Sequence, residues 1–153
     1  RNTGNPVKVY ILADLLEISD ERWRGAVEGY LNNQKFYFLV EPAYYQKALH
    51  VYDRMKRKHG CRAVGLVDVG KLREKEMIHT ADDSLAKKIE TENELARSYV
   101  DYLLGRVICC DNVEQLRSYK TAITSEGMLY QGYVARALRR GHRAFLGSDD
   151  SDV

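Results

Sequence analysis

The chain has 153 residues, a length that fits one domain able to bury most of the surface its unfolded form exposes. Its 24 basic and 22 acidic side chains leave a net charge of only +2, so the overall field argues neither for nor against a polyanionic partner. No apolar run approaches the roughly 20 residues needed to cross a bilayer, and no signal-peptide pattern opens the chain. Three cysteines, two of them adjacent, do not make a disulfide framework. We therefore expect a soluble cytoplasmic protein with no membrane partner.

The first part of the chain alternates β-type runs with helical patterns. Residues 7–12 form a short β-type run. A capped helical pattern follows, with an apolar stripe at Trp23, Ala26, Val27, Tyr30 and Leu31. Residues 36–40 are a continuous apolar run, typical of a strand covered on both faces. Pro42 begins a second helical pattern that ends at Gly60, and residues 63–67 predict the next strand.

The second helical pattern predicts an inner face of Tyr45, Ala48, Leu49, Tyr52 and Met55. Residues 70–84 are rich in charge and lack a clear period, which predicts a short helix and a connecting loop, and from Ser84 a modest helical pattern follows. Because strands and helices alternate in this order, we expect right-handed crossovers and a largely parallel sheet.

Residues 93–133 carry the clearest pattern of the chain. An amphipathic helical segment stops at Gly105, and the buried apolar run 107–110 follows it. A further helical pattern then leads into a short β-type run and into a strand-like, aromatic-bearing sequence that contains Gly127 and Gly132. No nucleophile, base or metal ligand stands where chemistry would need it. The stretch is typical of a surface built for contact.

Two patterns come near to known phosphate or metal sites. Residues 65–72 satisfy G-x-x-x-x-G-K but carry leucine where a phosphate loop needs a hydroxyl for magnesium. Glu41 and Asp68 end successive predicted strands, as in a magnesium-dependent Toprim-type nuclease or topoisomerase domain. Pro42 and Gly70 depart from that pattern. The alternative, which we prefer, is that Glu41 lies near a helix start and Asp68 simply ends a strand.

The cysteines and histidines also favour structural roles. Cys109 and Cys110 could form a strained disulfide or bind a soft metal, but neighbouring residues of a strand face opposite ways, so we expect them to pack in the core. The four histidines share no metal-ligand spacing. We expect no catalytic residue, no metal and no cofactor in this chain.

Two basic clusters are candidates for nucleic-acid contact, because such clusters bind phosphate without sequence preference. The first comprises Arg54, Lys56, Arg57 and Lys58. The second comprises Arg136, Arg139, Arg140 and Arg143. For the first cluster a solvated helix end explains the charge equally well.

Taken together, these patterns resemble those of the hinge domain of SMC-type chromosome-organising ATPases. Residues 12–72 resemble its first half, through a helix of the form Ala-x-Glu-x-x-Leu that here contains Glu28. Residues 99–133 resemble the closing part, with its "yLLG" and "T-x-x-G" patterns. The resemblance runs from about Val9 to Leu138 and is nearest to the condensin-like MukB/MksB/JetC group, which includes a subunit of the Wadjet plasmid-defence system.

The resemblance implies an α/β, SMC-hinge-like fold of two α/β halves, with mixed, mostly parallel strands and flanking helices. It implies one domain over residues 1–153, with a first half at about 7–74, a connecting segment at about 75–92 and a second half at about 93–140. The implied function is mechanical: a non-catalytic dimerisation hinge of a DNA-organising or plasmid-defence ATPase whose ATP site lies outside this segment. The alternative is the Toprim-like enzyme.

The implied partners are a second copy of the hinge, DNA bound without sequence preference, the parent coiled coil and accessory subunits, at the nucleoid. The expected dimer interface comprises Gly127, Met128, Tyr130, Gly132 and Tyr133. Small residues there allow a partner backbone to come close, and an exposed strand edge can pair with another chain. SMC hinges usually carry several closely spaced glycines after T-x-x-G, whereas this chain has only two before its basic run.

Overall fold

The structure, a computed structural model, describes residues 7–56, 64–139 and 146. The strands are β1 (Val9–Ile11), β2 (Glu17–Ile18), β3 (Phe38–Val40), β4 (Ile89–Glu90), β5 (Ile108–Cys110), β6 (Thr121–Thr124), β7 (Met128–Gln131) and β8 (Val134–Ala137). The α-helices are α1 (Arg24–Leu31), α2 (Tyr45–Met55), α3 (Val69–Lys75) and α4 (Glu94–Leu104). Short 3-10 helices are η1 (Leu12–Leu15), η2 (Glu21–Trp23), η3 (Asn32–Phe36), η4 (Pro42–Tyr44), η6 (Leu85–Lys88) and η7 (Val113–Ser118).

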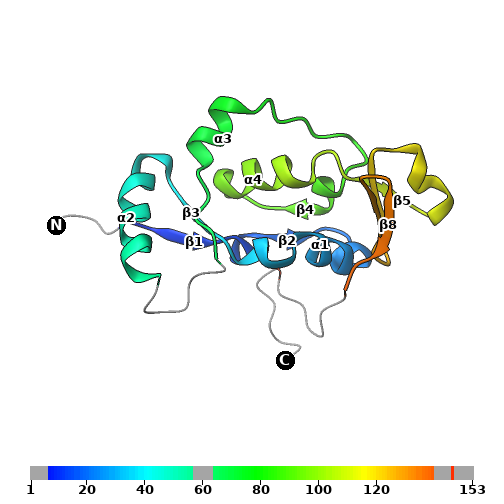
Figure 1. The fold of residues 1–153 in the computed structure, drawn as a ribbon, viewed down its shortest axis with the longest axis horizontal. Coiled ribbons are helices and arrows are strands. Elements are labelled where there is room, and N and C mark those ends of the chain that lie inside the picture. The colour runs from blue at the N-terminus through cyan, green and yellow to red at the C-terminus, as the bar shows by residue number, and fades with distance from the viewer. Residues whose placement is uncertain (1–6, 57–63, 140–145, 147–153) are drawn as a thin grey trace.

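The molecule is elongated, with a different sheet toward each end (Figure 1). At one end β1 pairs with β3, and α2 lies beside them. At the other end β5, β6, β7 and β8 form a four-stranded sheet in that order. Between the two ends, α3 and α4 lie on one side, and α1 and the small β2–β4 pair complete the middle.

The mixed α/β character predicted from the sequence is confirmed, but the prediction of mostly parallel strands is wrong. Only β5 and β6 form a parallel ladder in the described residues, with one further parallel bridge from Phe38 to Leu66. The β1–β3, β2–β4, β6–β7 and β7–β8 pairs are antiparallel. For β6–β7 and β7–β8 the cause is connection length, because the short turns after β6 and β7 can only join antiparallel neighbours.

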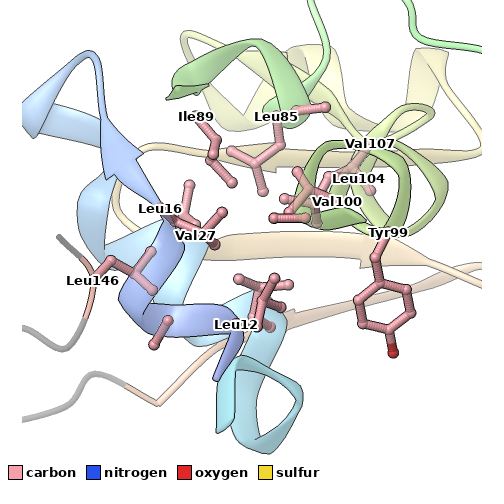
Figure 2. Packing of buried hydrophobic residues seen from close by; sticks show 14 of the residues in the cluster. Leu12, Leu16, Val27, Leu85, Ile89, Tyr99, Val100, Leu104, Val107 and Leu146 are labelled. Atoms are coloured by element: carbon pink, nitrogen blue, oxygen red, sulfur yellow. The ribbon is translucent and has the colours of Figure 1, made fainter. Parts of the chain in front are cut away.

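One main hydrophobic core joins the two predicted halves of the chain (Figure 2). Leu12, Leu16 and Val27, from the first half, face side chains from η6 and α4. Leu85, Val100 and Leu104 on that side are fully buried. Leu146, far along the chain, packs into the same cluster, and its peptide groups bond to Arg24 and Glu28 of α1. A smaller cluster of Cys110, Leu116 and Ala122 lies on the other face of the four-stranded sheet.

Helix α1 forms where the apolar stripe predicts it. The Asp20 carboxylate accepts a hydrogen bond from the Arg22 backbone N–H and so caps the preceding 3-10 turn. Trp23, Ala26, Val27 and Leu31 are buried. At the other end of the helix the buried Lys35 donates a hydrogen bond from its ammonium group to the Asn32 carbonyl at 2.8 Å, which holds the chain just after α1.

Helix α2 does not have the buried inner face that its sequence predicts. Not one of its residues is buried, and Met55, an expected core residue, is 41% exposed. Tyr52 is its main contact, through an edge-on ring contact with Phe38 and a hydrogen bond to the Val64 carbonyl. The helix lies at an end of the molecule, so its apolar side has little to pack on. Its predicted end at Gly60 lies outside the described residues.

One further prediction is wrong in the region before α4. The helical pattern from Ser84 forms a 3-10 turn and then strand β4, because the Ile89 segment pairs with Ile18 of β2. The short helix predicted within residues 70–84 is confirmed as α3, which begins one residue earlier, at Val69. None of the helices in the described part of the chain has the length and apolar character needed to cross a membrane.

Candidate interaction surface

The β7–β8 hairpin is closed by a tight two-residue turn. Gly132 and Tyr133 join the paired residues Gln131 and Val134, and both turn residues have positive φ, 61° and 66°. This is the geometry of a type I′ turn, whose twist matches that of the flanking strands. Glycine adopts such a φ freely, whereas a tyrosine does so only at a cost. The tyrosine side chain at the tip is 93% exposed.

Strand β8 forms an open edge of the sheet. All four of its residues are exposed. The Leu138 N–H donates to the Gly127 carbonyl at 2.8 Å, and in an antiparallel ladder the residues facing the partner strand alternate with residues facing away. The peptide groups of Arg136 and Val134 therefore face β7, while those of Ala135 and Ala137 point outward, past the last strand of the sheet.

The opposite edge of the same sheet is covered. The Cys109 N–H donates to the Asp83 carbonyl at 2.8 Å, and the Leu85 N–H donates to the Val107 carbonyl at 2.7 Å. Ser84 also forms an antiparallel bridge with Ile108 of β5. Within the described residues, β8 is thus the one edge of this sheet that another chain can extend.

The structure separates the predicted interface residues into two groups. Gly127 is buried in the turn before β7 at φ 94°, where an added Cβ would lie 3.8 Å from that of Leu138. Met128 and Tyr130 pack against the small cluster that contains Leu116. These three residues therefore serve the fold itself. Gly132 and Tyr133 are exposed at the hairpin tip and free to meet a partner.

Strand β8 itself was missed by sequence reasoning. Its residues Val134–Ala137 contain two alanines and an arginine, with no apolar alternation to mark a strand. One signal for the strand was available in the sequence. Gly132 and Tyr133 make a two-residue connection, which is a typical length for the turn of a β-hairpin. The strand exists because it pairs with β7, and it buries none of its own residues.

The basic clusters are only partly described. Arg136 and Arg139 are exposed and line a cavity of about 460 Å3 together with Tyr30 and Gln131, whose side chains are hydrogen bonded at 3.1 Å. At the other end Arg54 is exposed, and Lys56 forms an ion pair with Asp53. Arg57, Lys58, Arg140 and Arg143 lie outside the described residues. The DNA-binding role of both clusters stays a prediction.

The carboxylates of the enzyme alternative do not form a metal site in the structure. The Asp68 carboxylate accepts a hydrogen bond from the Lys71 N–H at 3.0 Å and caps α3, and Glu41 is exposed at the start of η4. Across the described ranges, no group of three or more His, Cys, Asp or Glu side chains could hold a metal ion. The arrangement does not favour a magnesium-dependent nuclease.

The capping role of Asp68 predicts a specific pattern of stabilities. Asp68→Ala removes the acceptor for the Lys71 N–H and is expected to cost about 0.5–2 kcal/mol, whereas Asp68→Asn keeps an acceptor and most of the stability. Thermal unfolding with and without magnesium checks this. A magnesium-dependent rise in the melting temperature that Asp68→Asn abolishes would instead support the metal-site alternative.

The vicinal cysteines divide between the two faces of the sheet. Cys109 packs against the main core, and Cys110 belongs to the small cluster on the other face. Burial raises the pKa of Cys109 to about 12, so its thiol stays protonated and unreactive at neutral pH. Both thiols are free, as core packing predicts.

Comparison with known proteins identifies the class. The family model of the SMC proteins' flexible hinge domain matches residues 8–119, most of the chain. The chain therefore belongs to the SMC flexible hinge domain family, as the sequence resemblance implied. The match stops before the β7–β8 hairpin. No curated protein matches the chain.

Solved SMC hinge structures have the same fold. The Pyrococcus furiosus SMC hinge domain is 21% identical with a TM-score of 0.64, and the alignment covers 93% of this chain and 78% of that one. An asymmetric dimer of the Geobacillus stearothermophilus SMC hinge domain is 14% identical with a TM-score of 0.65, covering 92% of this chain and 61% of that one. A Pyrococcus furiosus hinge with an extended coiled coil is 22% identical, with a TM-score of 0.64 and coverage of 88% and 49%. The chain thus spans about half of that longer structure, and the MukB/MksB/JetC assignment stays a prediction.

Proposed function

We propose that this hinge domain pairs with a second copy of itself through the edge of β8. The observation that carries the proposal is that the outward peptide groups of Ala135 and Ala137 stand on an exposed strand at the end of the molecule. Protein sheets usually protect such edges with charge, proline or a bulge, because an open edge pairs readily with another strand. Here the residues with outward peptide groups are alanines, whose short side chains leave room on the face of the sheet for the side chains of an added strand.

The hairpin tip adds apolar surface to this edge. Tyr133 is 93% exposed and Val134 is 55% exposed, and they follow one another at the start of β8. At such a contact the unpaired edge supplies backbone hydrogen bonds, and the large apolar side chains beside it supply buried area. Strands that add to the edge of a sheet bind through this combination. The relative described as an asymmetric hinge dimer supports self-association in this family.

The parent protein follows from the same proposal. The relative solved as a hinge domain with an extended coiled coil supports a parent protein in which this domain adjoins a coiled coil. In this reading the domain is the non-catalytic joint of an SMC-type ATPase, and ATP binds in another part of that protein. The proposal also includes the system in which the parent protein works, either DNA organisation or plasmid defence. This part rests on the sequence resemblance.

Light scattering across concentration tests the proposal. The domain has a mass of 17.6 kDa, and we expect the measured mass to rise toward twice that value as the protein reaches micromolar concentrations. Because a coiled coil would raise the effective concentration, weak pairing of the isolated domain is sufficient for function. A mass of one chain at every concentration up to the millimolar range contradicts the proposal.

We also propose that DNA contacts the hinge beside the hairpin. Arg136 and Arg139 are exposed at the mouth of a polar cavity, and the described part of the chain places no carboxylate in its lining. Phosphate contacts by such side chains are sequence-independent and weaken as salt rises.

Charge reversal tests the DNA contact. We expect the double substitution Arg136→Glu and Arg139→Glu to weaken duplex binding and to reduce the salt slope by about two, close to one per lost phosphate contact. Fluorescence anisotropy at two or more salt concentrations measures both quantities. Lys87→Glu, an exposed cation on η6, is the matched control and is expected to bind as the unchanged protein does. Equal losses in the control and the double variant would argue against a local site.

A further inference from the structure

Exposed apolar side chains gather at the end of the molecule formed by β1 and α2. The helix lies on one face of the β1–β3 pair, because the Tyr52 ring meets Phe38 of β3 edge-on, with 6.4 Å between the ring centroids. Ile11 pairs with Phe38 and Val9 pairs with Val40, so the side chains of Val9 and Ile11 stand on that same face. Val40 is 1% exposed, whereas Val9 is 48% and Ile11 38% exposed. On this face β3 is covered and β1 is left open.

Helix α2 carries an apolar stripe that is also exposed. The stripe begins at Tyr44, the last residue of η4, and continues through Ala48, Val51 and Met55 of α2. The spacings are four, three and four residues, which is the a and d spacing of a coiled-coil seam. Tyr44, Val51 and Met55 are exposed, and Ala48 is half-buried. At 100° per residue the stripe lies about a quarter of a turn from Tyr52, which faces the sheet.

The connection from β3 through α2 places this stripe beside β1. Leu66 bridges to Phe38 in parallel, on the side of β3 opposite to β1. Connections of this kind between parallel strands are right-handed in nearly all proteins, and that hand turns the stripe of α2 toward β1. The helix and the strand thus present adjoining apolar side chains, here called the α2–β1 face: Val9, Ile11, Tyr44, Val51 and Met55.

Cations border the α2–β1 face along the helix. Lys47 and Arg54 are seven residues apart and exposed, so they form one line next to the stripe. Neither forms an ion pair with another described residue. With the stripe at a and d, both occupy g positions, where a coiled-coil partner carries the opposite charge. Asp53, the only carboxylate of α2, lies on the far side of the helix and pairs with Lys56.

We propose that the α2–β1 face binds an amphipathic helix of a partner protein, one with carboxylates along the edge that meets Lys47 and Arg54. Helices bind such surfaces through an apolar seam of matching spacing, and complementary charges select the partner. From Tyr44 to Met55 the stripe spans about 16 Å, so about three turns of helix cover it. The face lies at the opposite end of the molecule from β8 (Figure 1), so this contact does not compete with the proposed pairing of two hinges.

Two designed peptides test the proposal. Each has three heptads with leucine at every a and d position. One carries glutamate at every e and g position and the other lysine, and these like charges keep each peptide from pairing with itself. Anisotropy of the labelled peptide, titrated with the full chain, gives the dissociation constant. We expect the glutamate peptide to bind at least about tenfold more tightly than the lysine peptide. Equal affinities, or no binding of the glutamate peptide, overturn the proposal.

Substitutions in the stripe locate the binding of the glutamate peptide. Val51→Glu places a carboxylate in the seam and is expected to raise the dissociation constant at least about tenfold. Val51 is exposed and glutamate favours helix, so we expect the melting temperature to stay unchanged. Val113→Glu, at another exposed valine on η7, is the matched control and should bind as the unchanged chain does. Equal binding by Val51→Glu and the control would mean that the peptide binds elsewhere, and the proposal fails.

Charge reversal separates helix recognition from general stickiness of an apolar surface. We expect the double substitution Lys47→Glu and Arg54→Glu to reverse the preference, so that the lysine peptide binds more tightly than the glutamate peptide. An apolar contact without charge recognition would leave the ratio of the two dissociation constants unchanged, and that result contradicts the proposed partner chemistry.

Two other occupants of the α2–β1 face are distinguished by further measurements. We expect Val51→Glu to leave the mass of the chain in light scattering unchanged at every concentration. A dimer that this substitution dissociates would show that a second copy covers the face. We also expect the full-length parent protein to bind the glutamate peptide as the isolated domain does. Binding by the domain alone would show that the parent's own coiled coil covers the face. Either of these contrary results overturns the inference.

Discussion

Replacing Gly105 with alanine is expected to destabilise the fold by at least about 1–3 kcal/mol. A Cβ at this position would lie 2.4 Å from the Asp101 carbonyl oxygen and 2.4 Å from that of His79. Both obstacles are backbone atoms, so neither can rotate away as a side chain would. The loop that follows α3 is also hydrogen bonded to Gly105, whose carbonyl accepts from the Ala81 N–H at 2.9 Å. Relief of the clash would therefore displace either the end of α4 or this loop.

Thermal or urea unfolding checks the Gly105 prediction, with Gly29→Ala as the matched control. A Cβ at Gly29, within α1, meets its nearest atoms, from Leu138 and Arg139, at 3.4 Å, an ordinary contact. Alanine also favours helix over glycine by up to about 1 kcal/mol. We expect Gly29→Ala to be neutral or stabilising. If Gly105→Ala were as stable as the control, this result would contradict the close approach of the His79 carbonyl to the end of α4.

Replacing Ala135 with proline is expected to dissociate the proposed dimer while leaving the monomer folded. The Ala135 N–H points away from β7, so proline removes no hydrogen bond of the β7–β8 ladder. It does remove a donor at the outer edge and places its ring where the partner backbone would lie. The loss of even one or two interface hydrogen bonds raises the dissociation constant about tenfold or more.

The neighbouring residue supplies the contrast for the proline experiment. Arg136 faces β7 in the register with Leu129, so Arg136→Pro breaks the ladder of the hairpin and is expected to lower the stability of the domain itself. Mass by sedimentation and secondary structure by circular dichroism distinguish the two results. A dimer that survives Ala135→Pro with unchanged affinity would mean that the β8 edge is not the interface.

Much of the fold could be predicted from sequence because the core elements have strong patterns. The stripe from Trp23 to Leu31 becomes α1, and the apolar run before Asp111 becomes β5. Gly105 ends α4 as expected, but for a different reason. Its φ is −64°, which any residue adopts, and glycine is needed because two carbonyl oxygens approach it.

The errors arise where contacts far along the chain decide the structure. The apolar side of α2 follows a helical period, yet periodicity does not reveal whether a neighbour exists to cover it. The residues around Ile89 satisfy a helical pattern, but pairing with β2 makes them a strand. Local propensity cannot anticipate such pairings.

The candidate site was predicted only in outline. Gly132 and Tyr133 were placed at an interface from the family resemblance and lie at the exposed tip, while Gly127 and Met128 serve the packing of the sheet. Strand β8, which carries the open edge, has no apolar pattern, because it is held in the sheet by backbone pairing with β7 and buries none of its side chains.

Amide hydrogen exchange along β8, followed by NMR at increasing protein concentration, tests the central claim most directly. Val134 and Arg136 face β7 and are expected to be protected at every concentration. Ala135 and Ala137 are expected to exchange rapidly in dilute protein and to become protected as the second copy pairs with the edge. If the domain dimerises while these two alanine amides continue to exchange as fast as in the monomer, the β8 edge does not hold the two copies together.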